Sequence, residues 1–443
     1  MKQSVRIGVV CLARKTYDFK AAGEIYKKTQ EKLRQIPDVE WTIIPELVIE
    51  VGDAKKAAET FAKSRLDGMV IITGTFHLGH LALVLKKAVD VPVLLWAFNE
   101  LPYNGGKIRL NSLCGLNLNA SNLYKAGFDD IHYCVSDDID PDWVDAIRMK
   151  TSLTRAHIGI VGYRADGFFN LDIDEMDTYK KTGILIDHYE ISDVTGMPVD
   201  QDRLTEYGTV VKNSFDASGV NGRQVGKVQE LCAKFEAFIK KNSLSAVAVR
   251  CWPEFANMFG ISPCAAMSVL QSRGYVLGCE GDLEGTMSML ICKAVCDQPP
   301  FLADLSQIDL KENYALLWHC GVAPLSLWDG SSVCSLDTYF AGGRGVTAGF
   351  VLKSGRINVV RIDSARGKTR LFLEGGNAVP MEKQLTGTYG KVVFDHNVKD
   401  VLDSVVKTGV AHHVSMAYGE YRRSFEIFAE MMGYDMIVPR PQS

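Results

Sequence analysis

Residues 248–289 decide the fold class that this sequence predicts. They read A-V-R-C-W-P-E-F (248–255), I-S-P-C-A-A-M (261–267) and Y-V-L-G-C-E-G-D-L-E-G-T-M-S-M (275–289). Two short apolar strands each run into acidic residues, and a helix follows each strand. Strands that alternate with helices are typical of a parallel, doubly wound sheet. Because parallel strands end at one edge of a sheet, Glu254 is expected to share a crevice with Glu280, Asp282 and Glu284.

The same alternation extends from this stretch toward the N-terminus, and the pattern changes after it. Strands alternate with helices over residues 1–148, which predicts a first α/β domain, and again over residues 149–297, which predicts a second. After Q-P-P (298–300) short strands are separated by turns rich in Gly, Asp and Ser, and K-S-G-R (353–356) indicates a hairpin. Residues 298–443 therefore predict a mainly antiparallel β domain, a partial barrel that carries His413.

Composition limits the function classes. The 443 residues are 47% hydrophobic and 23% charged, with a net charge of −4, as in an ordinary folded, soluble protein of two or three domains. A chain with this charge and no basic run is not expected to bind nucleic acid. The N-terminal apolar run is too short for a signal peptide or a membrane span. Eleven cysteines without C-x-x-C spacing indicate reduced thiols, and so a cytoplasmic protein.

The acidic residues and a late histidine pair are the candidates for chemistry. Glu254 could simply complement a helix dipole, and Asp282 could simply cap a helix, but both follow consecutive strands of one α/β unit. His412 and His413 lie in a short strand, whose alternation lets at most one of them enter a given site. Two carboxylates with one imidazole favour Mn²⁺, Mg²⁺ or Co²⁺ over zinc, which prefers Cys and His. His319, at a strand end in L-L-W-H-C-G, is a further candidate.

Several common catalytic motifs are absent from the sequence. There is no G-x-S-x-G elbow, no Walker A loop and no H-E-x-x-H helix. Their absence argues against serine hydrolases, nucleotide-driven enzymes and the common metalloproteases. No G-x-G-x-x-G follows the first strand, so no dinucleotide site is predicted.

Three segments together resemble a known family. With W-H-C-G (318–321) and A-H-H (411–413) beside E-G-D-L-E-G-T-M-S-M (280–289), most of the chain resembles the L-fucose isomerase and L-arabinose isomerase superfamily of metal-dependent aldose–ketose isomerases. The resemblance implies Mn²⁺, with Mg²⁺ or Co²⁺ as alternatives, bound by Glu254, Asp282 and His413, the second histidine of A-H-H. It places Glu280 and Glu284 outside this ligand set.

The mechanism expected from these residue types is an isomerisation through an enediolate. A divalent ion holding O1 and O2 of an open-chain sugar stabilises the enediolate, while a carboxylate moves the proton from C2 to C1. The resemblance implies Glu254 and Asp282 as this acid/base pair, and Trp252 and His319 as sugar contacts.

The resemblance also implies a homo-oligomer, a trimer or hexamer in which a neighbouring subunit completes each active site. Arg14, Thr16 and His77, at strand ends of the first domain, become candidate sugar contacts, although polar surface loops would look the same. Arg14 or His77 near an anionic group at C6 would suit a sulfonated or phosphorylated sugar. The C-terminal domain is shorter than in typical fucose isomerases, which leaves a 6-deoxyhexose, a pentose and a C6-sulfonated hexose open.

Two other functions remain compatible with the sequence. A non-catalytic sugar-binding or regulatory protein would need neither a metal nor the acidic pair. A metal-dependent sugar aldolase or epimerase would use the same enediolate chemistry and would release different products.

Overall fold

The computed structural model describes residues 2–339 and 343–440, and the chain forms two compact units. Unit 1 comprises Met1–Thr151 and Arg423–Gly433, and unit 2 comprises Ser152–Arg422 and Tyr434–Ser443.

Unit 1 is built on a five-stranded parallel sheet in the order β2-β1-β3-β4-β5. Its strands are β1 (Val5–Leu12), β2 (Val39–Ile43), β3 (Gly68–Thr73), β4 (Val93–Ala97) and β5 (Ile131–Val135), and its helices are α1 (Phe19–Leu33), α2 (Val51–Lys63), α3 (His80–Ala88), α4 (Ser112–Lys125), α5 (Pro141–Thr154) and α14 (Arg422–Met432). Strands β3 and β4 are buried along their whole length, as expected for strands covered on both faces.

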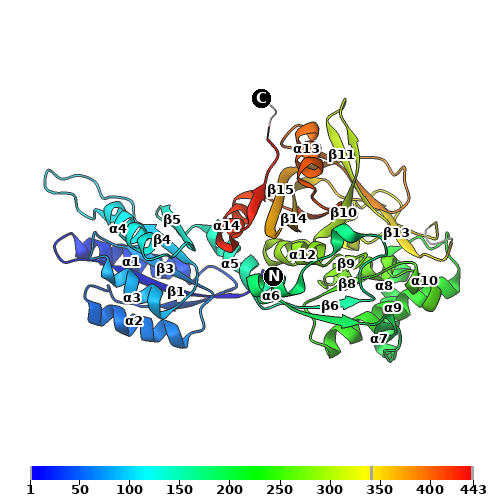
Figure 1. The fold of residues 1–443 in the computed structure, drawn as a ribbon, viewed down its shortest axis with the longest axis horizontal. Coiled ribbons are helices and arrows are strands. Elements are labelled where there is room, and N and C mark those ends of the chain that lie inside the picture. Colours follow the sequence, from blue (N-terminus) through cyan, green and yellow to red (C-terminus); the bar gives the residue numbers. More distant parts are fainter. Residues whose placement is uncertain (1, 340–342, 441–443) are drawn as a thin grey trace. The chain divides into compact units, whose positions relative to one another are not determined.

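Both faces of this sheet are covered by helices. Buried residues of α2, α3 and α4 form one apolar core with inward residues of β1, β3 and β4. Helix α5 lies against β3, since a Cβ added at Gly68 would lie 2.9 Å from the ring of Trp143. Figure 1 shows this unit in blue to cyan, with the sheet among its helices.

The first part of unit 2 is a four-stranded parallel sheet in the order β7-β6-β8-β9. Its strands are β6 (His157–Val161), β7 (Leu185–Tyr189), β8 (Ala246–Val249) and β9 (Leu277–Cys279). The helices among them are η1 (Phe169–Leu171), α6 (Glu175–Thr182), α7 (Ile191–Thr195), α8 (Gln201–Ser214), α9 (Gly222–Lys241), α10 (Glu254–Met258) and α11 (Cys264–Ser272).

A mainly antiparallel sheet of nine strands forms the second part of unit 2, in the order β12-β13-β16-β11-β10-β17-β14-β15-β18. The remaining elements are β10 (Phe301–Asp309), β11 (Tyr314–His319), η2 (Leu325–Leu327), β12 (Ser335–Asp337), β13 (Thr347–Val351), β14 (Gly355–Ala365), β15 (Lys368–Val379), β16 (Thr388–Phe394), α13 (Val398–Thr408), β17 (His413–Tyr418) and β18 (Asp435–Ile437). Because β15 also pairs with β16, the strands from β16 round to β15 close into a ring. The predicted fold class, two parallel α/β sheets followed by a partly closed antiparallel sheet, is confirmed.

Helix α12 (Leu283–Val295) lies between the two sheets of unit 2 and contacts both. Figure 1 shows it with the green parallel strands on one side and the yellow to orange antiparallel strands on the other. Nearly all of its residues are buried, because it has a sheet on each side. One apolar core therefore runs through both sheets. The domain boundaries predicted near residues 148 and 297 stay a prediction.

Candidate metal centre and active site

The turn after β9 brings a carboxylate into the interior of unit 2. Glu280 has φ +60° and Gly281 has φ +71°, so two successive residues adopt the left-handed conformation. A Cβ at Gly281 would lie 2.4 Å from the carbonyl oxygen of Tyr163, which explains why glycine occupies this position. Glu280 Oε1 accepts a hydrogen bond of 3.1 Å from Nε1 of Trp252. Its other oxygen lies 3.6 Å from Nε2 of His412 and 3.4 Å from Nε2 of His413.

Three neighbouring strands of the antiparallel sheet supply the rest of the site. Strand β10 lies between β11 and β17, and Asp304 is directly opposite both Trp318 and His413. Side chains of directly opposed residues project on one face about 5 Å apart. Asp304 Oδ1 accordingly lies 3.4 Å from Nε2 of His413. His319 follows Trp318, and its ring centre is 5.4 Å from that of His413.

Glu280, Asp304, His319, His412 and His413, here called the imidazole–carboxylate cluster, fit a divalent cation. Ligand atoms of Asp304, His319 and His413 lie within 4.8 Å of one another, as do those of Glu280, His412 and His413. The Nε2 atoms of His319 and His413 are buried without a hydrogen-bond partner. A buried imidazole nitrogen that faces carboxylates without a hydrogen bond is suited to a metal ion. The structure thus contains a possible metal-binding site.

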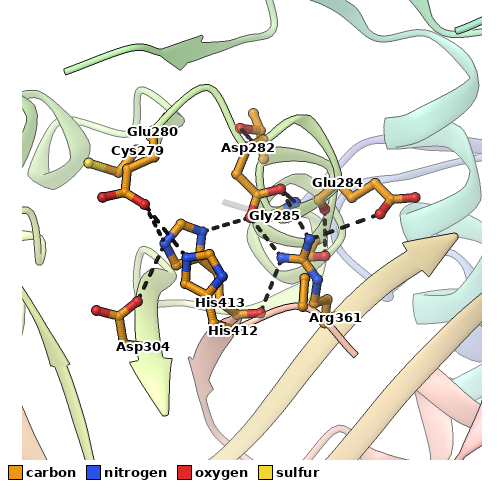
Figure 2. A network of polar contacts seen from close by, with 12 residues as sticks. Cys279, Glu280, Asp282, Glu284, Gly285, Asp304, Arg361, His412 and His413 are labelled. Carbon is orange, nitrogen blue, oxygen red and sulfur yellow. Dashed lines mark hydrogen bonds and ion pairs between the residues drawn. The ribbon is translucent and has the colours of Figure 1, made fainter. Parts of the chain in front are cut away.

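Asp282 orients His413 from the far side of its ring. The carboxylate is fully buried, and its Oδ2 lies 2.8 Å from Nδ1 of His413 and 2.7 Å from Arg361, as Figure 2 shows. Oδ1 accepts from the backbone N–H of Gly285, which caps α12, and from the second Arg361 nitrogen at 3.2 Å. Since an ionised carboxylate only accepts, Nδ1 of His413 must carry a proton, so Nε2 is the nitrogen that faces Glu280 and Asp304 and that is available to a cation.

The pKa values of these acids follow from their partners. Burial acts to raise the pKa of Asp282, but the charge of Arg361 and the hydrogen bond of His413 outweigh it and hold the pKa well below its usual range. Burial also opposes ionisation of Glu280, yet the neighbouring rings of His412 and His413 lower its pKa strongly. Burial alone would lower the pKa of His413, whereas Asp282 and Glu280 raise it. A cation bound at Nε2 of His413 would take the place of a proton on that nitrogen.

The structure separates Glu254 from this cluster. Glu254 is the first residue of α10, and its Oε1 pairs with Arg250 at 2.6 Å. Its Oε2 is buried without a hydrogen-bond partner. It does not belong to the groups of potential ligands found among residues 2–339 and 343–440. Asp282 does contact His413, but both of its oxygens are already occupied. The ligand and acid/base roles predicted for Glu254 and Asp282 therefore stay predictions.

The predicted sugar contacts divide between the two units. In unit 2, Trp252 holds Glu280, and His319 belongs to the cluster. In unit 1, Arg14 is half-buried and Thr16 is exposed after β1. His77 is fully buried, and its ring nitrogens contact the carbonyl oxygen of Thr75 and the amide of Asn119. Burial lowers the pKa of His77, and its role as a sugar contact stays a prediction.

The sequence interpretation gave Asp304 no role and gave Glu280 a secondary one. The signal for Asp304 is slight: it is the charged residue in F-L-A-D-L (301–305), at the start of a strand that is otherwise apolar there. The prediction that at most one histidine of the pair enters a site also differs from the structure, since both rings reach Glu280. His412 precedes β17, and the alternation of a strand does not apply to it.

Comparisons with known proteins agree on one family of sugar isomerases. A family model described as "Fucose/sulfoquinovose isomerase, N-terminal domain" matches residues 8–156. A protein named sulfoquinovose isomerase from Priestia aryabhattai is 28% identical over 435 residues, which is 94% of this chain and 95% of that protein. One of the same name from Alkalicoccus urumqiensis is 24% identical over 96% of this chain and 97% of its own length. The chain belongs to the fucose isomerase-like superfamily.

As a member of this superfamily, the chain is an aldose–ketose isomerase. The similarity to the named relatives extends over 94% of the chain, so it is not confined to unit 1. Among solved structures, a sugar-bound periplasmic binding protein from Actinobacillus succinogenes aligns with 56% of this chain and 78% of its own at 10% identity. Its TM-score of 0.17 is too low to support a conclusion.

Among the described residues, none of the helices is long and apolar enough to cross a bilayer.

Proposed function

We propose that this chain converts a C6-sulfonated aldohexose into the corresponding ketose, with the imidazole–carboxylate cluster of unit 2 as its reaction centre. The observation that carries the proposal is the approach of Glu280 and Asp304 to the same unpartnered nitrogen of His413, each at 3.4 Å. The relatives named sulfoquinovose isomerase support the choice of sugar, because sulfoquinovose is a hexose with a sulfonate at C6.

Glu280, Asp304 and His413 are the residues proposed to hold a divalent cation, with His319 beside them. Two carboxylates and imidazole nitrogen favour Mn²⁺, and Mg²⁺ or Co²⁺ are the alternatives. When bound, such a cation would polarise the oxygen atoms of the sugar. This set differs from the predicted set of Glu254, Asp282 and His413. The change is supported by the Arg250 partner of Glu254 and by the four contacts that occupy Asp282.

Glu280 and Asp304 are also proposed as the groups that move protons. Conversion of an aldose into a ketose transfers one proton from C2 to C1 and another between O2 and O1, and carboxylates beside the sugar are suited to both transfers. Glu280 is ionised at neutral pH because its pKa is lowered by the neighbouring histidines. Trp252 holds one of its oxygens, while Asp282 and Arg361 hold the ring of His413. These contacts keep the reacting groups in position without rearrangement.

A sulfonate requires a cationic partner. Arg164 of unit 2 is proposed for this role, in addition to Arg14, which was predicted from the sequence. The backbone N–H of Ala165 donates to the carbonyl oxygen of Glu280, so Arg164 is anchored next to the carboxylate turn. Its guanidinium lies over the rings of Tyr163 and Phe169, and its buried Nε, which makes no hydrogen bond, lies 3.7 Å from Oδ1 of Asp172. A guanidinium fixed in this way matches the planar, multidentate recognition of an oxyanion.

The test compares sugars that differ at C6 alone. Purified protein with Mn²⁺ is incubated with sulfoquinovose, 6-deoxyglucose or glucose in D₂O, and NMR follows ketose formation and loss of the C2 proton. The proposal expects both signals with sulfoquinovose and much weaker ones with 6-deoxyglucose. Equal turnover of the two sugars would contradict sulfonate recognition, and carbon–carbon cleavage products would indicate an aldolase. Arg164→Gln is expected to remove the preference for sulfoquinovose through KM.

A homo-oligomer, a trimer or hexamer with sites shared between subunits, and a cytoplasmic location complete the proposal. The family resemblance supports the homo-oligomer with shared sites. The eleven cysteines, all of which are free thiols, support the cytoplasmic location, because such thiols are typical of reducing compartments.

A further inference from the structure

Four buried cysteines of unit 2 converge at one point beside the imidazole–carboxylate cluster. They come from separate segments: Cys251 follows β8, Cys264 begins α11, Cys279 ends β9 and Cys320 follows β11. None is more than 4% exposed. Cysteines that serve only as small apolar residues have no reason to gather from four segments. The four thiols therefore form a buried cluster in unit 2.

Short distances connect the four sulfur atoms as two pairs. Cys251 Sγ lies 3.1 Å from Cys279 Sγ, and Cys264 Sγ lies 3.6 Å from Cys320 Sγ. Cys279 Sγ and Cys320 Sγ lie within 4.8 Å of each other and of a ring nitrogen of His319, which links the two pairs. In a tetrahedral site with metal–sulfur bonds of about 2.3 Å, neighbouring sulfurs are about 3.8 Å apart. Cys251 and Cys264 each contact one member of the group formed by Cys279, His319 and Cys320 but do not themselves lie within 4.8 Å of all its ligand atoms, so both must shift inward for the four sulfurs to surround an ion.

We propose that Cys251, Cys264, Cys279 and Cys320 form a binding site for one thiophilic divalent cation of the zinc type, here called the four-sulfur site. Sulfur ligands select zinc-like ions, whereas the carboxylates and imidazoles of the neighbouring cluster select harder ions such as Mn²⁺. On binding, the thiols release their protons to solvent and their sulfurs become ligands. The two sites would thus be filled by different metals in the same chain.

The position of the four-sulfur site indicates a structural role for the bound ion. Cys251 is next to Trp252, Cys279 is next to Glu280 and Cys320 is next to His319. An ion bound to these sulfurs would tie together the three segments that carry those side chains. His319 Nδ1 already lies 3.2 Å from Cys320 Sγ, so the ring is in contact with the proposed site. The ion would therefore act as a structural fastener beneath the reaction centre.

The experiment uses the reduced full-length protein with excess Mg²⁺ to occupy hard sites. After chelation and dialysis, Co²⁺ is added as a spectroscopic substitute for zinc. The proposal expects an intense sulfur-to-cobalt charge-transfer band and the strong visible bands of a tetrahedral ion, both displaced by one equivalent of Zn²⁺. Weak bands typical of oxygen and nitrogen ligation would overturn it. Zinc is also expected to raise the midpoint of thermal unfolding.

Variants identify the sulfurs. Cys320→Ala and Cys264→Ala are expected to lose the charge-transfer band, whereas Cys292→Ala, which removes another buried thiol of unit 2, should retain it. A band equally weakened by Cys292→Ala would contradict the assignment. Because the first two variants could fail to fold, X-ray absorption of the zinc-loaded native protein provides a second measurement. A scattering shell of sulfur near ~2.3 Å supports the site, and a purely nitrogen–oxygen shell near ~2.0–2.1 Å overturns it. Titration of free thiols provides a further check. If two thiols are missing from the protein, the close pair Cys251 and Cys279 forms a disulfide, and the proposed metal site is overturned.

Discussion

Asp304 lies four residues after Pro300 in a strand, and its neighbours in the chain do not mark it as a ligand. Its importance arises from register, since β10 places it opposite His413 on one side and Trp318 on the other. Glu280 depends in the same way on a left-handed turn, which aims its carboxylate at the same histidine. Both properties require contacts between residues far apart in the sequence.

Removal of one charge in the cluster should abolish metal binding without unfolding the protein. Glu280→Gln and Asp304→Asn each replace a carboxylate by an amide of the same shape, so we expect both variants to lose Mn²⁺ affinity and to lose roughly 10²–10⁴-fold in turnover. Isothermal titration with Mn²⁺ and the NMR assay would measure these effects. Glu254→Gln is the matched control. If this variant binds Mn²⁺ normally, the imidazole–carboxylate cluster is supported as the metal site. If Glu254→Gln alone loses Mn²⁺ binding, Glu254 is the ligand, as the sequence predicted.

Asp282 should act on both stability and metal affinity. Asp282→Asn leaves Arg361 buried without its main counter-charge, which typically costs about 3–5 kcal/mol of unfolding free energy. It also weakens the acceptor that orients His413, so Mn²⁺ affinity is expected to fall about 10–100-fold. Urea unfolding and calorimetric titration measure the two effects. The control is Asp187→Asn, which removes an exposed partner of His157 and should change neither the unfolding free energy nor the Mn²⁺ affinity. Unaltered Mn²⁺ affinity in Asp282→Asn would exclude the role of Asp282 in orienting His413.

At the scale of elements, a buried carboxylate on α9 joins three segments. Glu236 accepts hydrogen bonds from Tyr207 of α8 and from Tyr275 before β9, and it pairs with Lys240 one turn along its own helix. Burial acts to raise the pKa of Glu236, but these partners lower it overall. The carboxylate therefore helps to fasten α8 and the strand edge to α9.

This arrangement predicts a pH-dependent stability. Since the folded pKa is below the unfolded value of about 4.3, the contribution of Glu236 is present above that pH and is lost as the pH falls through the folded pKa. Glu236→Gln should thus destabilise unit 2 by about 1–3 kcal/mol at pH 7, and the difference should shrink toward zero below about pH 4. Urea unfolding at several pH values measures it. Glu230→Gln, which removes a more exposed partner of Lys234, is the control, and a difference that persists at low pH would contradict the account.

At the scale of the whole molecule, the proposed sharing of sites between subunits predicts complementation. If unit 1 of one copy completes the site in unit 2 of another, an inactive Arg14→Ala chain and an inactive Glu280→Gln chain should recover activity when co-expressed. Random mixing of two chains in equal amounts restores about a quarter of the sites in a symmetric ring. The NMR assay on the purified mixture measures the recovery. Activity no higher than that of either variant alone would show that each site belongs to one chain.

Much of the fold follows from local sequence patterns. Apolar runs such as G-M-V-I-I-T (68–73) and the helices between them predicted parallel α/β sheets, and the turns after Q-P-P predicted the antiparallel sheet, because period and turn chemistry are local properties. The family was likewise evident from short segments around Glu280, His319 and His413.

The arrangement of the candidate site was decided by the tertiary structure. Sequence alone favoured Asp282 and Glu254 over Glu280, since an acid before a helix looks the same whether it caps, pairs or binds. Burial beside Arg361 gave Asp282 its partners, and the pairing of β10 with β17 brought Asp304 to His413. The same folding gathered four cysteines that are 69 residues apart from first to last, from Cys251 to Cys320. Which side chains converge depends on strand register and burial, and these are set by contacts between distant parts of the chain.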